Sequence, residues 1–509
     1  MLLWLILIPL TGGLLCWQSD RFGNLPRWIA LATMLTVFAM SLWLWSVGDY
    51  SLARGIHDAP QWQLEYRHAW IPHLGMSLHL GVDGLSLALV ILTGFIGILS
   101  ILCSWREIQR STGFFHLNLL WILGGVIGVF LALDLFLFFL FWEMMLVPMY
   151  FLIALWGHRG SSGKSRISAA TKFFIYTQAS GLLMLLSILG LVFAHADATG
   201  VLTFDYEELL GTVLAPGTGF LLMLGFFIAF AVKLPVVPLH GWLPDAHSQA
   251  PTAGSVDLAG LLLKTAAYGL LRFALPLFPQ ASASFAPVAI WLGLAGIYYG
   301  AFQAFAQTDI KRLVAYTSIS HMGYVLIGIY AGTAMALQGT VVQMIAHGLS
   351  ASALFVLCGQ LYERLHTRDL REMGGLWAHL PWLPAMMMFF IAASLGLPGT
   401  GNFIGEFLIL AGSWPVAPLV AALGTGGLVF ATAYSLALVH RSMFGPVRSD
   451  TPIAGPSLRE LVMLLSLVGS IIALGIYPQP VLDMASAPVA RVQQIYAPPA
   501  GQSHASVPR

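Results

Sequence analysis

Residues 227–245 read FIAFAVKLPVVPLHGWLPD, an apolar run that reaches Lys233 and is then interrupted by Pro235 and Pro238. Proline lacks the backbone N–H that a helix needs, and its ring clashes with the preceding turn, so these residues predict a helix that breaks just after Lys233. A charge in such surroundings costs roughly 2.5–3.5 kcal/mol at the centre of a membrane helix and is rarely present without a role. The stretch therefore predicts a broken helix that carries a functional amine.

A second interrupted run lies in the other half of the chain. Residues 395–406 read LGLPGTGNFIGE, so Pro398 and Gly399 break the run shortly before the carboxylate of Glu406. Carbonyls that such a break frees are tolerated inside a membrane only where they face protein or water. Two broken helices in separate halves are the usual sign of inverted structural repeats. The alternative is a pair of unrelated proline kinks.

The composition identifies the environment of both runs. Of 509 residues, 58% are hydrophobic and 9% are charged, whereas soluble proteins carry about a quarter charged residues. The chain is therefore predicted to be an all-α polytopic membrane protein. A net charge of +1 gives no indication of nucleic-acid binding. Because there is no linker or low-complexity block, residues 1–509 are predicted to form one transmembrane domain.

Apolar runs long enough to cross a bilayer, about 20 residues each, predict about 14 transmembrane helices. The first run has no basic region and no clear cleavage site, so it is predicted to be a retained helix rather than a signal peptide. Residues 47–77 are predicted to form a loop between spans. The spans cover residues 2–17, 28–46, 80–103, 115–133, 135–155, 171–194, 220–235, 256–273, 286–305, 314–330, 337–361, 384–410, 416–440 and 458–477.

Basic residues concentrate in every second loop. They follow the odd-numbered spans, whereas the loop between spans six and seven is acidic and the loop after span two is mixed. By the positive-inside rule the basic loops face the cytoplasm, and both termini are predicted to be periplasmic. The basic residues are Arg21, Arg27, Arg106, Arg110, Arg159, Lys164, Arg166, Lys172, Lys311, Arg312, Arg364, Arg368, Arg371, Arg441 and Arg448.

Four ionisable residues lie within the predicted spans: Glu143, Lys233, Lys264 and Glu406. Burial disfavours the charged form of each, and a nearby opposite charge favours it again, so small changes in spacing can load or release a proton. Two acids and two amines therefore predict a proton route through the membrane. The alternatives are that Glu143 is a neutral helix contact, that the lysines serve structure, and that backbone amides satisfy Glu406.

His321 and His347 lie in later spans, between Lys264 and Glu406 in the sequence. Because neutral imidazole both donates and accepts a hydrogen bond, the two histidines are candidates for a proton relay. The alternative is that they only form hydrogen bonds between helices.

The sequence holds no recognisable cofactor or metal motif. Cys16, Cys103 and Cys358 form no CxxC pair, which argues against an iron–sulphur cluster, a zinc site or a disulfide framework. His240 and His247 flank the first break, but no carboxylate or thiolate set completes a metal site. The glycines near residue 400 lack the spacing and the preceding strand of a dinucleotide-binding loop.

Four segments carry a resemblance to a known family: FWEMMLVP at residues 141–148, KLPVVPLHGWLPDAH at 233–247, DIKRL at 309–313 and GTGNF at 399–403. The chain resembles, nearly end to end, the antiporter-like proton-channel family of bacterial NADH-quinone oxidoreductase, respiratory complex I. Its length and residues 173–181 are similar to the M-type subunits rather than to the L or N subunits.

The resemblance implies roles for the four ionisable residues. Glu143 would pair with Lys233, Lys264 would be the central relay, and Glu406 would end the path on the broken twelfth helix.

The resemblance also implies a fold and partners. The fold would have 14 helices, with helices seven and twelve broken and two inverted five-helix repeats at about residues 115–273 and 286–440. Flavin, iron–sulphur clusters and quinone would belong to partner subunits, so this chain would hold no cofactor. Its neighbours would be the L and N antiporter-like subunits in a bacterial inner membrane.

These inferences predict a proton-translocating subunit of NADH:quinone oxidoreductase. A proton would enter from the cytoplasm near Lys233, pass to Lys264, continue past His321 and His347 to Glu406, and leave to the periplasm. Two alternatives remain: a subunit of a multisubunit sodium/proton antiporter or membrane-bound hydrogenase, and a mainly structural subunit whose charges only hold helices together.

Overall fold

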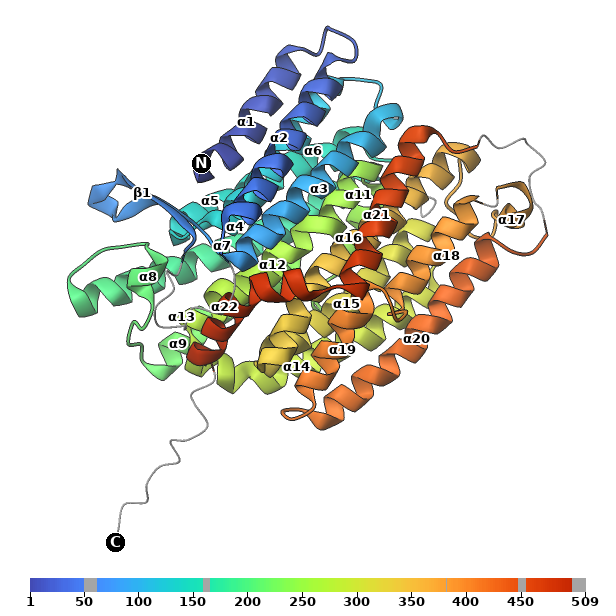
Figure 1. Ribbon diagram of the computed structural model, residues 1–509. Helices are drawn as coiled ribbons and strands as arrows, with labels where there is room; N and C mark the ends of the chain where they lie inside the picture. The colour runs from blue at the N-terminus through green and yellow to red at the C-terminus, as the bar shows by residue number, and fades with distance from the viewer. Residues whose placement is uncertain (50–61, 159–164, 381, 447–454, 497–509) are drawn as a thin grey trace.

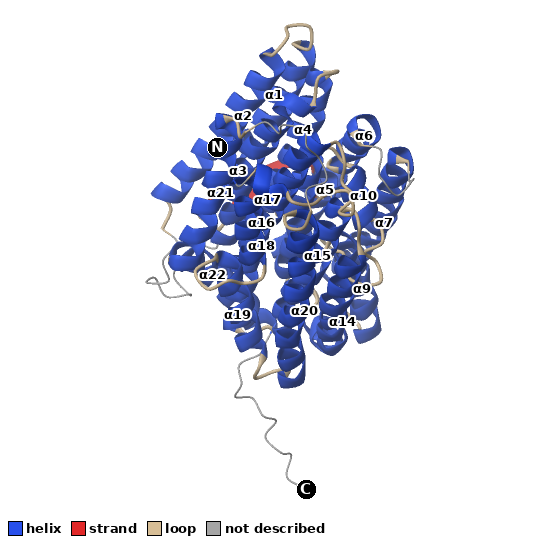
Figure 2. Ribbon diagram, turned by 90° about the vertical axis from the view of Figure 1, so that its right-hand side faces the viewer, coloured by secondary structure: helices blue, strands red, loops and turns tan. Residues whose placement is uncertain are grey.

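The computed structural model describes residues 1–49, 62–158, 165–380, 382–446 and 455–496. Long helices stand side by side in one bundle, and a two-stranded hairpin projects from one end (Figure 1). Figure 2 shows the bundle from the side, with helices making up nearly all of it. The predicted all-α polytopic class is therefore confirmed. Of the basic loop residues, Arg159, Lys164 and Arg448 lie outside the described ranges.

Each predicted span has its helix in the structure. Among the described residues, 12 helices are long and apolar enough to cross a membrane, and the shorter apolar helices α1 (Leu2–Gln18) and α18 (Trp382–Ser394) account for the remaining two spans. The long helices are α2 (Leu25–Val47), α3 (Gly84–Glu107), α4 (Thr112–Leu131), α5 with α6 (Leu135–Met144 and Leu146–Trp156), α7 (Arg166–Thr199), α9 (Pro216–Lys233), α11 to α13 (Thr252–Leu277), α14 (Pro279–Ala306), α15 (Ile310–Ala331), α16 (Ala334–Leu365), α20 (Pro418–Ser442) and α21 (Leu458–Ile476).

Both predicted breaks are present. α9 ends at Lys233, and α10 (Leu243–Gln249) begins after the proline-rich segment. The indole N–H of Trp242 donates to the Val232 carbonyl across this break, at 2.7 Å. The second break separates α18 from α19 (Gly401–Ser413). Gly399 has a φ of +93° there, which residues with a side chain rarely adopt, so glycine permits the turn.

Two further spans are interrupted where the sequence analysis expected continuous helices. Met145 separates α5 from α6, because Pro148 cannot donate a hydrogen bond to the Met144 carbonyl. Span eight consists of α11 (Thr252–Asp257), α12 (Leu263–Gly269) and α13 (Leu275–Leu277), joined by the π-helical segments η2 (Leu258–Leu262) and η3 (Leu270–Ala274). Such π-helical turns occur frequently at functional sites.

The ends of the bundle contain elements that the sequence analysis did not predict. The expected loop holds β1 (Leu64–Ile71), η1 (Pro72–Leu74) and β2 (Met76–Val82), which form an antiparallel hairpin, so span three starts at Gly84 rather than at residue 80. A last helix, α22 (Gln479–Tyr496), crosses the bundle (Figure 1) and packs against α3, α13, α14 and α16. The remaining short helices are α8 (Tyr206–Leu209) and α17 (Leu376–His379).

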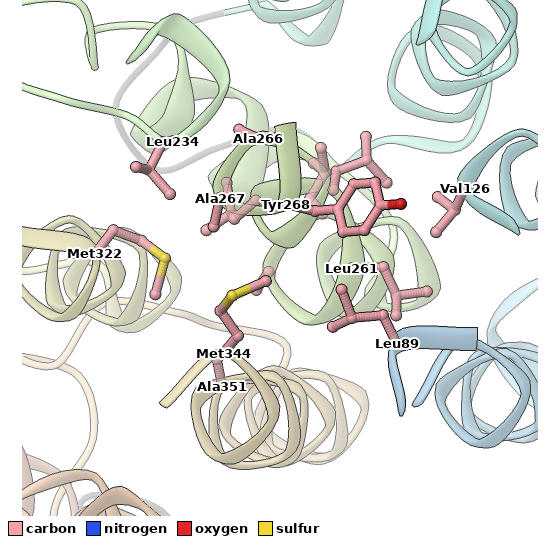
Figure 3. Packing of buried hydrophobic residues seen from close by; sticks show 14 of the residues in the cluster. Leu89, Val126, Leu234, Leu261, Ala266, Ala267, Tyr268, Met322, Met344 and Ala351 are labelled. Carbon is pink, nitrogen blue, oxygen red and sulfur yellow. The ribbon is translucent and has the colours of Figure 1, made fainter. Parts of the chain in front are cut away.

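Large side chains fill the middle of the bundle. Figure 3 shows Tyr268 of α12 pointing toward Val126 of α4, while Met322 of α15 and Met344 of α16 lie on the other side of it. Tyr268, Met322 and Met344 are all buried. The Tyr268 hydroxyl donates to the Phe130 carbonyl of α4 at 2.9 Å, so its polar end is satisfied. This packing keeps water away from the surroundings of α12, the helix that carries Lys264.

A buried ion pair ties span three to span eight. Asp83 accepts a hydrogen bond from the backbone N–H of Ser86 at 2.9 Å, which caps α3, and it also pairs with the guanidinium of Arg272. The guanidinium lies over the Trp62 ring, 4.9 Å from the ring centroid. Because both charged groups are buried, each depends on the other for its stability.

Replacing Asp83 with alanine should therefore destabilise the fold strongly. We expect Asp83→Ala to lower the free energy of unfolding by about 3–5 kcal/mol, because it leaves the Arg272 guanidinium buried without a partner. Thermal unfolding of the purified protein measures the loss. The double variant Asp83→Ala/Arg272→Met should recover much of it, and a double variant no more stable than Asp83→Ala would contradict the prediction.

His79 attaches the hairpin to the acidic loop between α7 and α9. Its Nδ1 lies 2.7 Å from Asp205 Oδ2, and its Nε2 lies 2.9 Å from Glu65 Oε1. Burial works to lower the pKa of His79, but the hydrogen bonds and charges of Asp205 and Glu65 outweigh it and raise that pKa. Burial works to raise the pKa of Asp205, and the contact with His79, aided by Arg67 at 3.1 Å, outweighs it and lowers that pKa.

These shifts predict a pH window for hairpin docking. The raised pKa of His79 stabilises the docked hairpin fully below about pH 6.5, the unfolded value, and this contribution is lost as the pH rises through the folded value. The lowered pKa of Asp205 stabilises it above about pH 3.9 and is lost on acidification. Hydrogen exchange at β1 and β2, corrected for intrinsic rates, should therefore be slowest between these limits. His79→Gln should remove the alkaline change, and an unchanged profile would contradict this account.

Candidate functional site

Lys264 lies fully buried on α12, directly after a π-helical segment. Its Nζ donates to the Ala259 carbonyl, five residues earlier, and lies 2.8 Å from Nδ1 of His347 on α16. A Cβ at Gly348 would lie 3.6 Å from Lys264 Cε and only 3.0 Å from the Gly260 carbonyl oxygen. Glycine at 348 therefore lets α16 approach closely enough for the imidazole to reach the amine.

Glu406 on α19 forms the other end of the same polar row. Its Oε1 lies 2.9 Å from Nδ1 of His321 on α15 and accepts a hydrogen bond from Nε2 of Gln343 on α16 at 3.0 Å. All three side chains are buried. Within the described residues the partners of this carboxyl are side chains rather than backbone amides.

The two histidines connect these ends. The rings of His321 and His347 lie with their centroids 5.6 Å apart. The structure thus brings Lys264, His347, His321 and Glu406 into one buried row across α12, α16, α15 and α19. The order along the row is His347 and then His321, the reverse of the order in which the sequence analysis placed them.

Glu143 and Lys233 are neighbours without a direct salt bridge in the described part of the chain. Both line one small cavity with Thr177 and Leu262, and its volume of about 10 Å³ is close to the space that one water molecule needs. Lys233 Nζ lies over the Trp142 ring, 3.5 Å from the centroid, a favourable cation–π position. The arrangement places the two side chains around the same small cavity, so that each can influence the charge of the other.

The break before Glu406 leaves space beside its second oxygen. A pocket of about 370 Å³ is lined by Gly396, Glu406 and apolar side chains of α19 and α20. Glu406 Oε2 has no hydrogen-bond partner among the described residues, and a Cβ at Gly396 would lie 3.2 Å from it. Pro398 and Gly399 therefore belong to the broken segment beside which this pocket lies. Pro235 and Pro238 belong in the same way to the broken segment that directly follows Lys233.

Asp257 and Arg272 are buried charged residues that the sequence analysis missed. They fell at the edges of the predicted span 256–273, where charges are common. The helical stretch Thr252–Leu277 is longer, so both lie inside it. A hydropathy average taken over the whole of residues 252–277 would have placed both residues inside the span and so could have found them.

The two histidines at the first break contact aromatic rings. His247 stacks on Phe355 with ring centroids 4.5 Å apart, and His240 meets the edge of Tyr299 at 4.7 Å. In the described ranges no group of three or more histidine, cysteine, aspartate or glutamate side chains converges as a metal site.

Comparison of the sequence with known proteins identifies its relatives. Residues 132–431 match the family model described as NADH:quinone oxidoreductase/Mrp antiporter, TM. The chain is 67% identical over 495 residues to NADH-quinone oxidoreductase subunit M of Escherichia coli K12, covering 96% of this chain and 97% of that one. The subunit M of Pseudomonas aeruginosa is 67% identical over 493 residues, with the same coverage.

Solved structures share the fold. A chain of respiratory complex I from Thermus thermophilus aligns with a TM-score of 0.85 and 29% identity over 97% of this chain and 100% of that one. A chain of the Mrp complex from Dietzia sp. aligns with a TM-score of 0.80 over 98% of this chain and 97% of that one, but at 20% identity it shows a common fold alone. The chain belongs to the antiporter-like membrane subunits of NADH:quinone oxidoreductase, among the M-type subunits.

Proposed function

We propose that this chain conducts protons in the membrane arm of NADH-quinone oxidoreductase, driven by electron transfer from NADH to quinone in other subunits. The observation that carries the proposal is the buried row of Lys264, His347, His321 and Glu406. An amine, two imidazoles and a carboxyl can each bind and release a proton. Their burial across four helices favours transport over a role in holding two helices together.

The pair of Glu143 and Lys233 would control loading from the cytoplasm. Two unit charges 4 Å apart attract by about 4 kcal/mol at an effective dielectric constant near 20. A tenfold change in proton affinity needs only about 1.4 kcal/mol. Approach of the two side chains across their small cavity is therefore enough to hold a proton on Lys233, and separation is enough to release it toward Lys264.

The row would then carry the proton to Glu406. The Lys264 ammonium gives its proton to Nδ1 of His347, and Nδ1 of His321 gives one to Glu406 Oε1. The Nε2 atoms of both histidines have no partner among the described residues, so the step between the rings uses these free nitrogens through ring rotation or an intervening water molecule. Release follows from Glu406 toward the pocket beside it.

We also propose the surroundings in which the chain works. The chain lies in a bacterial plasma membrane with both termini periplasmic, between the L-type and N-type antiporter-like subunits. It takes no part in redox chemistry, and flavin, iron–sulphur clusters and quinone are bound by partners. The two broken helices belong to inverted repeats at about residues 115–273 and 286–440.

Removing either the loading pair of Glu143 and Lys233 or the central relay Lys264 should abolish most pumping. We expect Glu143→Gln and Lys264→Ala to lower NADH-driven proton pumping at least tenfold, because a positioned proton-transfer group typically supplies about a hundredfold or more. Fluorescence quenching of a pH-sensitive dye in membrane vesicles measures it. Asp483→Asn, which removes an exposed carboxylate, is the control. Unchanged pumping in the first two variants would refute the proton route, and loss of assembly alone would favour a structural subunit.

Purification through a tag on this chain tests its assembly. In mild detergent we expect NADH:quinone reductase activity, flavin and iron–sulphur clusters to copurify, because the redox groups would lie in partner subunits. An intact complex that lacks all three and exchanges sodium for protons would instead indicate a cation/proton antiporter.

A further inference from the structure

Asp257 is a buried acid that the route from Lys233 to Glu406 does not use. It lies on α11 and is fully shielded from solvent. Its Oδ1 accepts a hydrogen bond from the Ser100 hydroxyl of α3, but its Oδ2 has no partner in the part of the chain that the structure describes. A group that only joins α3 to α11 needs one oxygen, and an unpaired buried oxygen is costly. The second oxygen therefore points to a further role.

One side of Asp257 leads toward the end of the bundle that carries the basic loops. Ser100, which donates to Asp257, also accepts at its carbonyl a hydrogen bond from the Cys103 thiol, one turn further along α3, at 3.2 Å. Cys103 lines a small cavity with Glu363, Arg459 and Gln360. The cavity measures about 10 Å³, close to the space of one water molecule, and its walls are polar enough to hold one.

Gln360 supplies unsatisfied polar groups to this cavity. Its side chain is 5% exposed, and neither Oε1 nor Nε2 has a hydrogen-bond partner among the described residues. An amide that both donates and accepts can hold and orient a water molecule. Glu363, at the cavity wall, is only partly buried, so the cavity lies close to the surface of the chain.

The other side of Asp257 leads to Lys264. The two residues are seven apart on one helical stretch, a rise of roughly 10 Å. The Ser352 hydroxyl of α16 lies between them, because it donates to the Val256 carbonyl at 3.4 Å and would lie 2.5 Å from a Cβ at Gly260. A hydroxyl can accept one proton while it donates another, so Ser352 is a suitable intermediate.

We propose that Asp257 is a second proton-loading site, fed from the cytoplasm through the Gln360 cavity, that delivers protons to Lys264. It is separate from the pair of Glu143 and Lys233. The inference rests on the proposed function and deepens it, because it gives the central relay two entries.

The transfer needs no bond changes other than those to the moving proton. A hydronium ion at the cavity gives its proton to Oδ2 of Asp257 and leaves as water. The neutral carboxylic acid passes a proton through the Ser352 hydroxyl to the uncharged amine of Lys264. Asp257 returns to the carboxylate, and Lys264 becomes an ammonium that the row then discharges.

Asp257→Asn in the intact complex tests this entry, because asparagine keeps the shape and the Ser100 hydrogen bond but binds no proton. NADH-driven pumping in vesicles should fall measurably but by less than about twofold, because the first entry, whose loss in Glu143→Gln lowers pumping at least tenfold, remains. Unchanged pumping would overturn the proposal and reduce Asp257 to a contact between α3 and α11. Asp483→Asn should pump as the parent does.

Gln360→Met provides a second variant on the same route. It keeps the side-chain length but removes the amide, so pumping should slow, and it should add nothing to Asp257→Asn because the two residues act in series. Losses that add would overturn the shared route. If Asp257→Asn does not assemble, an assembled Gln360→Met complex with unchanged pumping would overturn it as well.

Infrared difference spectroscopy detects protonation of the Asp257 carboxyl itself, which a purely structural role would not require. A carboxylic acid C=O band that shifts in D₂O should be present in the parent complex and missing in Asp257→Asn; a band that persists in the variant overturns the proposal. The variants Glu143→Gln and Lys264→Ala test the proposed proton route separately from the second entry. If they abolish pumping and Asp257→Asn leaves it unchanged, the second entry fails and the proposed function stands.

Discussion

A lysine that has no contact with bulk water constrains everything around it. The ammonium of Lys264 can stay in the middle of an apolar bundle only if hydrogen-bond acceptors are fixed within its reach. The Ala259 carbonyl and Nδ1 of His347 supply them. Each acceptor has a structural requirement. The carbonyl comes from the π-helical turn before Lys264, and the imidazole comes from α16, which approaches because Gly348 has no side chain.

The same constraint explains why irregular backbone lies beside Lys233, Glu143 and Glu406. Lys233 ends α9, Glu143 lies at the junction of α5 and α6, and Glu406 follows the break before α19. An unbroken helix satisfies its own backbone and leaves a buried charge with few partners, whereas an interruption frees backbone groups and makes room.

Much of this arrangement could be predicted from the sequence. Membrane thickness imposes the length of each span, and proline imposes the two breaks, so the spans, the breaks and the four charged residues were all found. The order of His347 and His321 depends on how α15 and α16 pack against each other. The periodicity of apolar residues along the sequence does not reveal that packing. Asp257 was missed because the edge of its span was misplaced by four residues. The helix α22 was missed because it lies across the bundle and is not apolar throughout.

The close contacts in the polar row also bear on ion selectivity. The amine and imidazole of Lys264 and His347 lie 2.8 Å apart, and His321 and Glu406 lie 2.9 Å apart. These are hydrogen-bond distances, with no space for a hydrated sodium ion. A metal cation that entered the row would lose its hydration shell. The row has no ring of oxygen atoms to replace that shell, as the selectivity filters of channels have. A proton needs only a donor and an acceptor, so the spacing of the row suits a proton and leaves no place for a hydrated metal cation.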